Sequence, residues 1–76
     1  MPTLARLTKS KVTMYAADHN PPHFHVLATD GAEAWVEIAS LTVIYGAVRP
    51  AALREALAWA GANKAALAAR WKVLNP

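Results

Sequence analysis

All three histidines of the chain lie within seven residues, in the segment Asp18–Val26, which reads DHNPPHFHV. Side chains alternate along an extended strand, so His23 and His25 would point to one side and Phe24 to the other. A pair of imidazoles can exchange protons near neutral pH or bind a metal ion. The segment therefore indicates either a chemical site or a stiff turn that leads into a strand.

Each kind of site needs further residues. A metal site would be completed by Asp18, His19 or Glu37, because zinc and related ions take carboxylate and imidazole ligands. Acid–base chemistry on RNA needs a base, an acid and a cation for the phosphate. The candidate cations are Arg6, Lys9, Lys11 and Arg49. The catalytic candidates are Asp18, His19, His23 and His25, and we expect no tightly bound metal and no other cofactor.

The two prolines stiffen the backbone before the strand. Pro21 favours an extended conformation in the residue before it, and Pro22 does the same to Pro21, so the chain enters His23 rigidly. Asp18 can accept backbone N–H bonds in this turn or hold His19 in one tautomer. A rigid backbone beside polar side chains is typical of a binding site and of an ordinary turn, and both interpretations stay open.

The histidine strand continues into a hairpin signal, Thr29–Gly31. A two-residue turn would bury two carboxylates of the following strand, at a cost of several kcal/mol unless they are paired. A three-residue loop with its glycine in the left-handed conformation turns apolar side chains inward instead. We therefore predict the three-residue loop, which places His23 opposite Glu37. In the same register His25 lies opposite Trp35.

The remaining pattern predicts further strands and then helices. Runs rich in β-branched and aromatic residues predict strands at 3–8, 12–17, 23–28, 32–39 and 41–45, with a turn at 9–11 and Gly46 interrupting the fifth. Pro50 suits a first helical turn and Gly61 a helix end, and Asn63 can cap a second helix. The inward-facing positions would be Leu53, Ala56, Leu57 and Ala60, then Leu67, Trp71 and Leu74.

These elements predict an α+β fold, a small antiparallel β-sheet of four to five strands followed by two C-terminal α-helices. We expect one domain over residues 1–76, with the sheet in 1–46 and the helical pair in 50–74. The chain has no cysteine, which excludes disulfides and cysteine-based zinc sites. It has no apolar run of about 18 residues and no signal-peptide core, so we expect a cytoplasmic protein away from membranes.

The small size and high apolar content of the chain predict a partner. A chain of 76 residues that is 55% hydrophobic and has three tryptophans cannot easily bury its apolar surface alone. We expect a homodimer or a heteromer, and the net charge of +3 permits contact with RNA without requiring it. Trp71 is predicted to be core, whereas Trp35 and Trp59 would cover the sheet or contact a partner. The binding candidates are Pro21, Pro22, Trp35, Glu37, Arg49 and Trp59.

Several stretches together resemble one family. MPT at the start, DHNPPHFHV, the DG hairpin and NKAALAARW near the end are similar to short bacterial proteins grouped as domain of unknown function 4160. The resemblance covers nearly the whole chain, and its most specific part is Asp18-His19-x-Pro21-Pro22-His23-x-His25-Val26. It implies a toxin of a type II toxin–antitoxin pair, with a small antitoxin-like protein as cognate partner. It implies no settled chemistry and no catalytic roles.

Three hypotheses follow for function. The first is a cytoplasmic toxin-like component that binds its cognate protein and acts on RNA or the translation machinery through Asp18–His25. The second is a non-catalytic interaction module whose histidine and proline turn is structural. The third is a histidine-based metal-binding domain.

Overall fold

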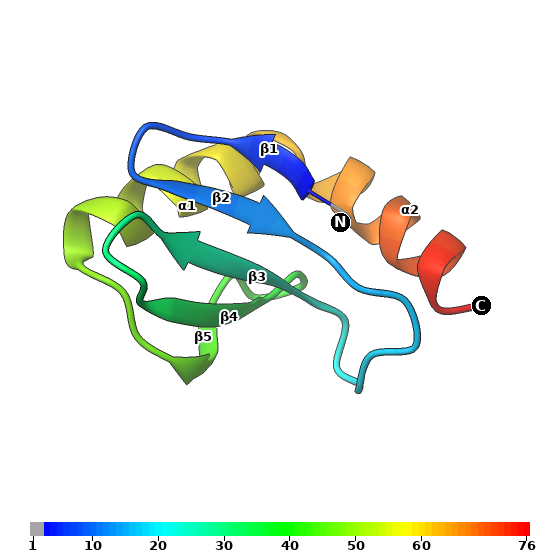
Figure 1. Cartoon of the computed structure of the whole chain (residues 1–76). Coiled ribbons are helices and arrows are strands. Elements are labelled where there is room, and N and C mark those ends of the chain that lie inside the picture. The colour runs from blue at the N-terminus through cyan, green and yellow to red at the C-terminus, as the bar shows by residue number, and fades with distance from the viewer. Residues whose placement is uncertain (1–2) are drawn as a thin grey trace.

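The computed structural model describes residues 3–76. Five antiparallel strands form one sheet in chain order, and two helices follow them (Figure 1). The strands are β1 (Thr3–Arg6), β2 (Ser10–Thr13), β3 (His23–Ala28), β4 (Glu33–Glu37) and β5 (Val43–Gly46), and the helices are α1 (Pro50–Ala62) and α2 (Lys64–Leu74). The predicted α+β architecture is confirmed.

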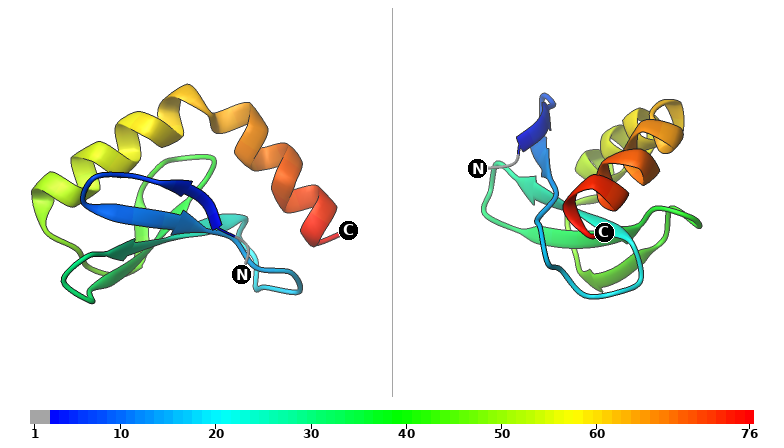
Figure 2. Two further views of the ribbon diagram at one scale, coloured as in Figure 1. Left: turned by 45° about the horizontal axis from the view of Figure 1, so that its top comes forward. Right: turned by 90° about the vertical axis from the view of Figure 1, so that its right-hand side faces the viewer.

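Both helices lie on the same face of the sheet. Figure 2 shows α1 and α2 as an arch over that face, with α2 descending toward the loop that joins β2 to β3. The core between the two layers comprises Val12, Met14, Phe24, Val26, Val36 and Ile38 from the sheet and the loop residues that follow its strands, and Ala56, Ala60, Leu67 and Trp71 from the helices. The opposite face of β3 carries the two histidines, as strand alternation requires.

The central hairpin has the predicted register. The N–H of Ala28 donates to the carbonyl of Ala32, which leaves a three-residue loop whose Gly31 has a φ of +92°. His23 pairs with Glu37, and His25 pairs with Trp35. The cost of burying carboxylates therefore identified the correct loop length and the correct face for the histidines.

The first hairpin differs from its prediction. The N–H of Leu7 donates to the carbonyl of Ser10, so the turn comes two residues earlier than the predicted 9–11 turn and β2 begins at Ser10. The chain leaves the sheet after Thr13, and residues 14–22 form a loop in which Ala17 has a φ of +55°. The apolar run over 12–17 predicted a strand, but its second half packs as a loop.

The later strands are also shorter or shifted relative to prediction. β4 ends at Glu37, because a turn closed by the N–H of Leu41 on the carbonyl of Glu37 follows it. β5 begins at Val43 and includes Gly46, which pairs with Ala34 and does not interrupt the strand.

The helices depart from prediction at their junction. Gly61 lies inside α1, which continues to Ala62. Asn63 precedes α2 but makes no side-chain cap there, and its amide donates instead to the carbonyl of Trp59 at 2.8 Å. Over residues 3–76, no helix is long and apolar enough to cross a membrane.

Alanines form the innermost face of α1. Ala52, Ala56 and Ala60 are buried at four-residue spacing, while Leu53 and Leu57 pack beside them and are only partly buried. Small side chains let the helix axis lie close to the sheet, and the leucines then fill the margins of the contact.

Candidate functional site

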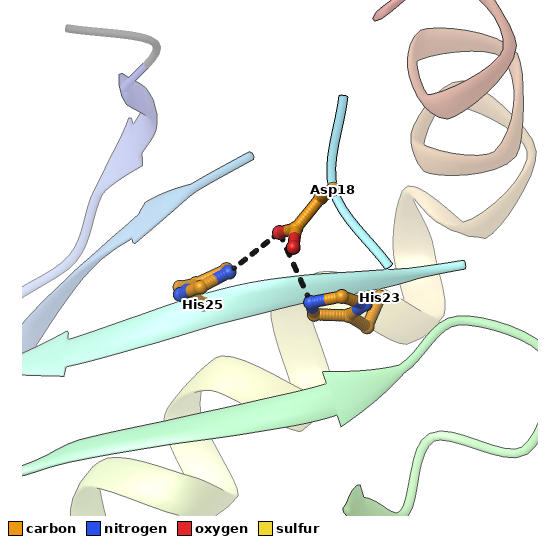
Figure 3. A group of neighbouring side chains, drawn as sticks. All are labelled: Asp18, His23 and His25. Carbon is orange, nitrogen blue, oxygen red and sulfur yellow. Dashed lines mark hydrogen bonds and ion pairs between the residues drawn. The ribbon is translucent and has the colours of Figure 1, made fainter. Parts of the chain in front are cut away.

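The loop between β2 and β3 carries Asp18 to the two histidines of β3. Oδ2 of Asp18 lies 3.1 Å from Nε2 of His23 and 3.1 Å from Nε2 of His25 (Figure 3). Both histidines are buried, with 2% of His23 and 6% of His25 exposed, and Asp18 is partly exposed. The structure thus brings together three of the four catalytic candidates, and we refer to Asp18, His23 and His25 as the histidine cluster.

His25 is held between two carboxylates. Its Nδ1 lies 2.9 Å from Oε2 of Glu33, and its Nε2 hydrogen-bonds to Asp18. An ionised carboxylate only accepts hydrogen bonds, so the ring of His25 is the donor in these contacts. Trp35 supports the same carboxylate, because its indole N–H donates to Oε2 of Glu33 at 2.9 Å.

The two carboxylates are stabilised in their charged forms. Hydrogen bonds from His25 and then from Trp35 lower the pKa of Glu33, and slight burial opposes them less strongly. Burial is the largest influence on Asp18 and raises its pKa. The hydrogen bond from His25, the backbone N–H of His19 and the nearby imidazole charges together outweigh that effect, so the pKa of Asp18 is also lowered.

His23 is bonded differently. Its Nδ1 lies 2.8 Å from the carbonyl oxygen of Pro21, and because a carbonyl only accepts, this nitrogen carries a proton. Its Nε2 is within ion-pair distance of Asp18 but is not aligned for a hydrogen bond. Within residues 3–76 this buried nitrogen has no hydrogen-bond partner. Such groups are rare in folded proteins and call for a physical explanation.

Aromatic rings surround the histidine cluster. Trp35 stacks on His23 at a centroid distance of 5.3 Å, and Trp71 of α2 lies 5.3 Å from the same ring. Tyr15 packs edge-on against His25 at 4.8 Å, and Tyr45 of β5 covers Trp35 at 4.4 Å. An apolar surround strengthens the electrostatic interactions within the cluster by excluding water.

The end of α2 holds the Asp18 loop in place. Oδ1 of Asn75 accepts the backbone N–H of Asp18 at 2.8 Å, and its amide donates to the carbonyl of Tyr15 at 3.3 Å. A pocket of about 420 Å³ opens beside Asp18, and its walls include Asn20, Trp71 and Asn75. The cluster is therefore close to a space that a ligand could enter.

The other predicted site residues lie elsewhere. His19 is exposed, and the backbone N–H of His19, not its imidazole, bonds Oδ1 of Asp18. Glu37 is opposite His23 in the register, but its carboxylate bonds Ser40. Arg49 pairs with Asp30 at 3.1 Å, at the hairpin end of β3, away from the cluster.

The remaining binding candidates are partly covered. Trp35 is half-buried among the histidines and Tyr45, so it covers this face of the sheet, one of the two roles predicted for it. Trp59 packs against the core beside Leu67 and Asn63, and Trp71 is core as predicted. Pro21 contributes its carbonyl to His23, and the carbonyl of Pro22 accepts the N–H of Ile38.

Two important side chains were not among the predicted site residues. Glu33 is the diagonal neighbour of His25 on the same face, so the predicted register already contained the signal for it. Asn75 comes from the last residues of the chain, and neither its type nor its spacing points to the Asp18 loop.

The cluster offers two kinds of chemistry. Two imidazoles beside a carboxylate can give and accept protons, as acid–base catalysis requires. The same three side chains can instead bind a metal ion, since each offers one ligand atom within 4.8 Å of the others. Among residues 3–76, Asp18, His23 and His25 are the acidic and histidine side chains that lie close enough together to hold a metal ion.

A comparison with known protein families shows which family contains this chain. Residues 10–72 match the family described as Domain of unknown function (DUF4160). The chain belongs to this family. The match includes the whole histidine cluster, Glu33 and Trp71, and it confirms the family predicted from the sequence. Neither the curated proteins nor the solved structures that were compared give a significant match.

Proposed function

We propose that this chain is a toxin-like component of a bacterial toxin–antitoxin pair and that it acts on RNA or the translation machinery through the histidine cluster. In the cell it is held by a cognate small antitoxin-like protein. The membership in DUF4160 supports the proposal through the resemblance described above, and the site supplies the physical support.

The observation that carries the proposal is the concentration of charged groups among aromatic rings. Asp18 and His25 form an ion pair surrounded by aromatic rings, and such a pair is often no more stable than apolar residues of similar volume. Folding gives little reason to gather these groups, whereas functional sites gather them for their chemistry. The pocket beside Asp18 provides access from solvent.

The same face of the sheet also carries cations that could meet phosphate. Lys11 pairs with Leu27, which is two residues from His25 and shares its face. Arg6 pairs with Lys11 and is exposed. These two side chains replace Arg49 as the candidates for contact with an RNA backbone, because Arg49 lies at the hairpin end with Asp30.

A growth assay tests the proposal. The chain is expressed from an inducible promoter, alone and together with its cognate antitoxin-like protein. We expect growth arrest and reduced incorporation of labelled amino acids on induction, and recovery when the cognate protein is co-expressed. His25→Gln should abolish the arrest, whereas His19→Gln, which changes an exposed histidine of the same motif, should leave it intact.

The fold of each variant is checked by circular dichroism. Harmless expression of the folded wild-type chain would contradict the toxin role. Equal toxicity of wild type and folded His25→Gln would show that the histidine cluster is not the acting site.

A non-catalytic interaction module is the second candidate, and β5 favours it. This edge strand exposes Val43, Ile44 and Tyr45, with 39%, 42% and 61% of their surfaces accessible. An exposed apolar edge strand can pair with a strand of another chain. Partner binding would use the free backbone edge of β5 and action would use the histidine cluster, which Tyr45 of β5 adjoins through Trp35, so one protein can do both.

A further inference from the structure

Both histidines of the cluster use the same ring nitrogen for support. Nδ1 of His23 donates to the carbonyl of Pro21, and Nδ1 of His25 donates to the carboxylate of Glu33. Both Nε2 atoms then face Oδ2 of Asp18 (Figure 3). Histidines that bind metals almost always donate their second ring N–H to a carboxylate or a backbone carbonyl. The outer supports of a metal site are therefore already in place.

The distances also suit a metal ion. Each Nε2 lies 3.1 Å from Oδ2 of Asp18. Two ligand atoms bound at about 2.0–2.1 Å in a tetrahedral zinc site lie roughly 3.3 Å apart. One ligand atom from each of Asp18, His23 and His25 lies within 4.8 Å of the other two, so all three can face one ion.

The surroundings of Nε2 of His23 give the strongest argument. This nitrogen lies 3.1 Å from a carboxylate oxygen of Asp18, and only 2% of His23 is exposed. A metal ion bound by both atoms would satisfy them, because an imidazole nitrogen and a carboxylate oxygen are both metal ligands. The nitrogen has no hydrogen-bond partner among the described residues, so a hydrogen bond does not account for the contact.

We propose that Asp18, His23 and His25 bind a divalent transition-metal ion of the zinc class. Two imidazoles with one carboxylate favour zinc, iron or cobalt over magnesium and calcium, which prefer oxygen ligands. Three protein ligands leave a coordination position free, as in catalytic zinc sites, and the pocket beside Asp18 can supply it with water or a substrate.

The inference departs from the sequence-based expectation of no tightly bound metal. The spacing His-x-His did not reveal that Glu33 and the carbonyl of Pro21 take both Nδ1 atoms. The metal proposal rests on the proposed function, because it concerns the same site, and it adds the class of ligand that the site binds. Its test measures binding and not growth, so either proposal can fail without the other.

Metal titration of the full, tag-free chain tests the site. The protein is stripped with a chelator, exchanged into chelator-free buffer and titrated with Zn²⁺ against a chromophoric competitor. We expect one equivalent to bind and the melting temperature to rise with free Zn²⁺. Co²⁺ should give the intense visible spectrum of a four-coordinate ion, whereas the weak spectrum of six-coordinate aqueous Co²⁺ would count against the site. Mg²⁺ should not compete.

Three variants distinguish this site from adventitious binding. His25→Gln should weaken Zn²⁺ binding by at least a hundredfold, and Glu33→Gln, which removes the carboxylate that supports His25 and leaves all three ligands in place, by about 10–100-fold. His19→Gln is the matched control and should bind as the wild type does. No stoichiometric binding by the folded wild type, or equal loss in His19→Gln and His25→Gln, would overturn the proposal. Should His25→Gln not fold, Glu33→Gln and the wild-type Co²⁺ spectrum decide.

Discussion

The two buried histidines differ in what accepts their hydrogen bonds. His25 bonds two carboxylates, whereas His23 bonds a backbone carbonyl and has a second nitrogen without a hydrogen-bond partner among residues 3–76. The two imidazoles therefore form an asymmetric pair beside one shared carboxylate. Protons and metal ions therefore compete for the same three side chains, since metal binding needs the ligands deprotonated.

The carboxyl groups of Asp18 and Glu33 predict how the stability of the fold depends on pH. Their folded-state pKa values are lowered, so they stabilise the fold fully above their unfolded values, near pH 4. This contribution is lost as the pH falls through the lower folded values. We expect Asp18→Asn to reduce the free energy of unfolding near neutral pH and the reduction to shrink as the pH falls below about 4. Urea unfolding of metal-free protein across this range measures it, and a constant difference between the two proteins would refute it.

At the scale of elements, the β4–β5 contact constrains one glycine severely. Gly46 has a φ of +74°, and a Cβ there would collide with the backbone carbonyl of Glu33. Gly31 in the hairpin loop has a φ of +92° but open space around it. Gly31→Ala should therefore cost only backbone strain, about 1–3 kcal/mol. Gly46→Ala should cost about 1–3 kcal/mol more because it adds overpacking.

Thermal and urea unfolding of the two variants tests this difference. The matched pair separates the collision from the strain, because both glycines have positive φ and only Gly46 is crowded. Equal destabilisation of the two variants would show that β5 moves aside without cost. Because the side chain of Glu33 bonds His25, a shift of Glu33 away from the new Cβ at position 46 would also disturb the histidine cluster.

Local pattern predicted the elements better than it predicted the site. Alternation and the cost of buried carboxylates were enough to place His23 and His25 on one face and to set the register with Trp35. Contacts between segments far apart in the sequence could not be predicted from this pattern. Periodicity assigns a residue to one face of the sheet but does not say which loop covers that face. Asp18 reaches the histidines only because the chain leaves the sheet after Thr13 and Asn75 fixes the loop from the far end of the sequence.

At the scale of the whole molecule, the chain encloses a continuous core but leaves two kinds of apolar side chain outside. The helices cover one face of the sheet and bury its alternating residues. Ile44 and its neighbours on the edge strand β5 remain exposed, as does Val73 on α2. The sheet has two edge strands, β1 and β5, and among residues 3–76 it is β5 that combines an unpaired edge with exposed large apolar side chains.

This asymmetry predicts how the chain assembles. We expect a homodimer formed by edge pairing of β5, because two-fold pairing is the commonest closed arrangement and buries Ile44 without another gene product. Light scattering at micromolar concentration should give about twice the chain mass of 8.2 kDa. Ile44→Lys should shift the protein to monomer, and Val73→Lys, an equal change at an exposed position of α2, should not. A wild-type monomer would leave β5 free for the cognate protein, whereas a dimer insensitive to both variants would refute pairing through this edge.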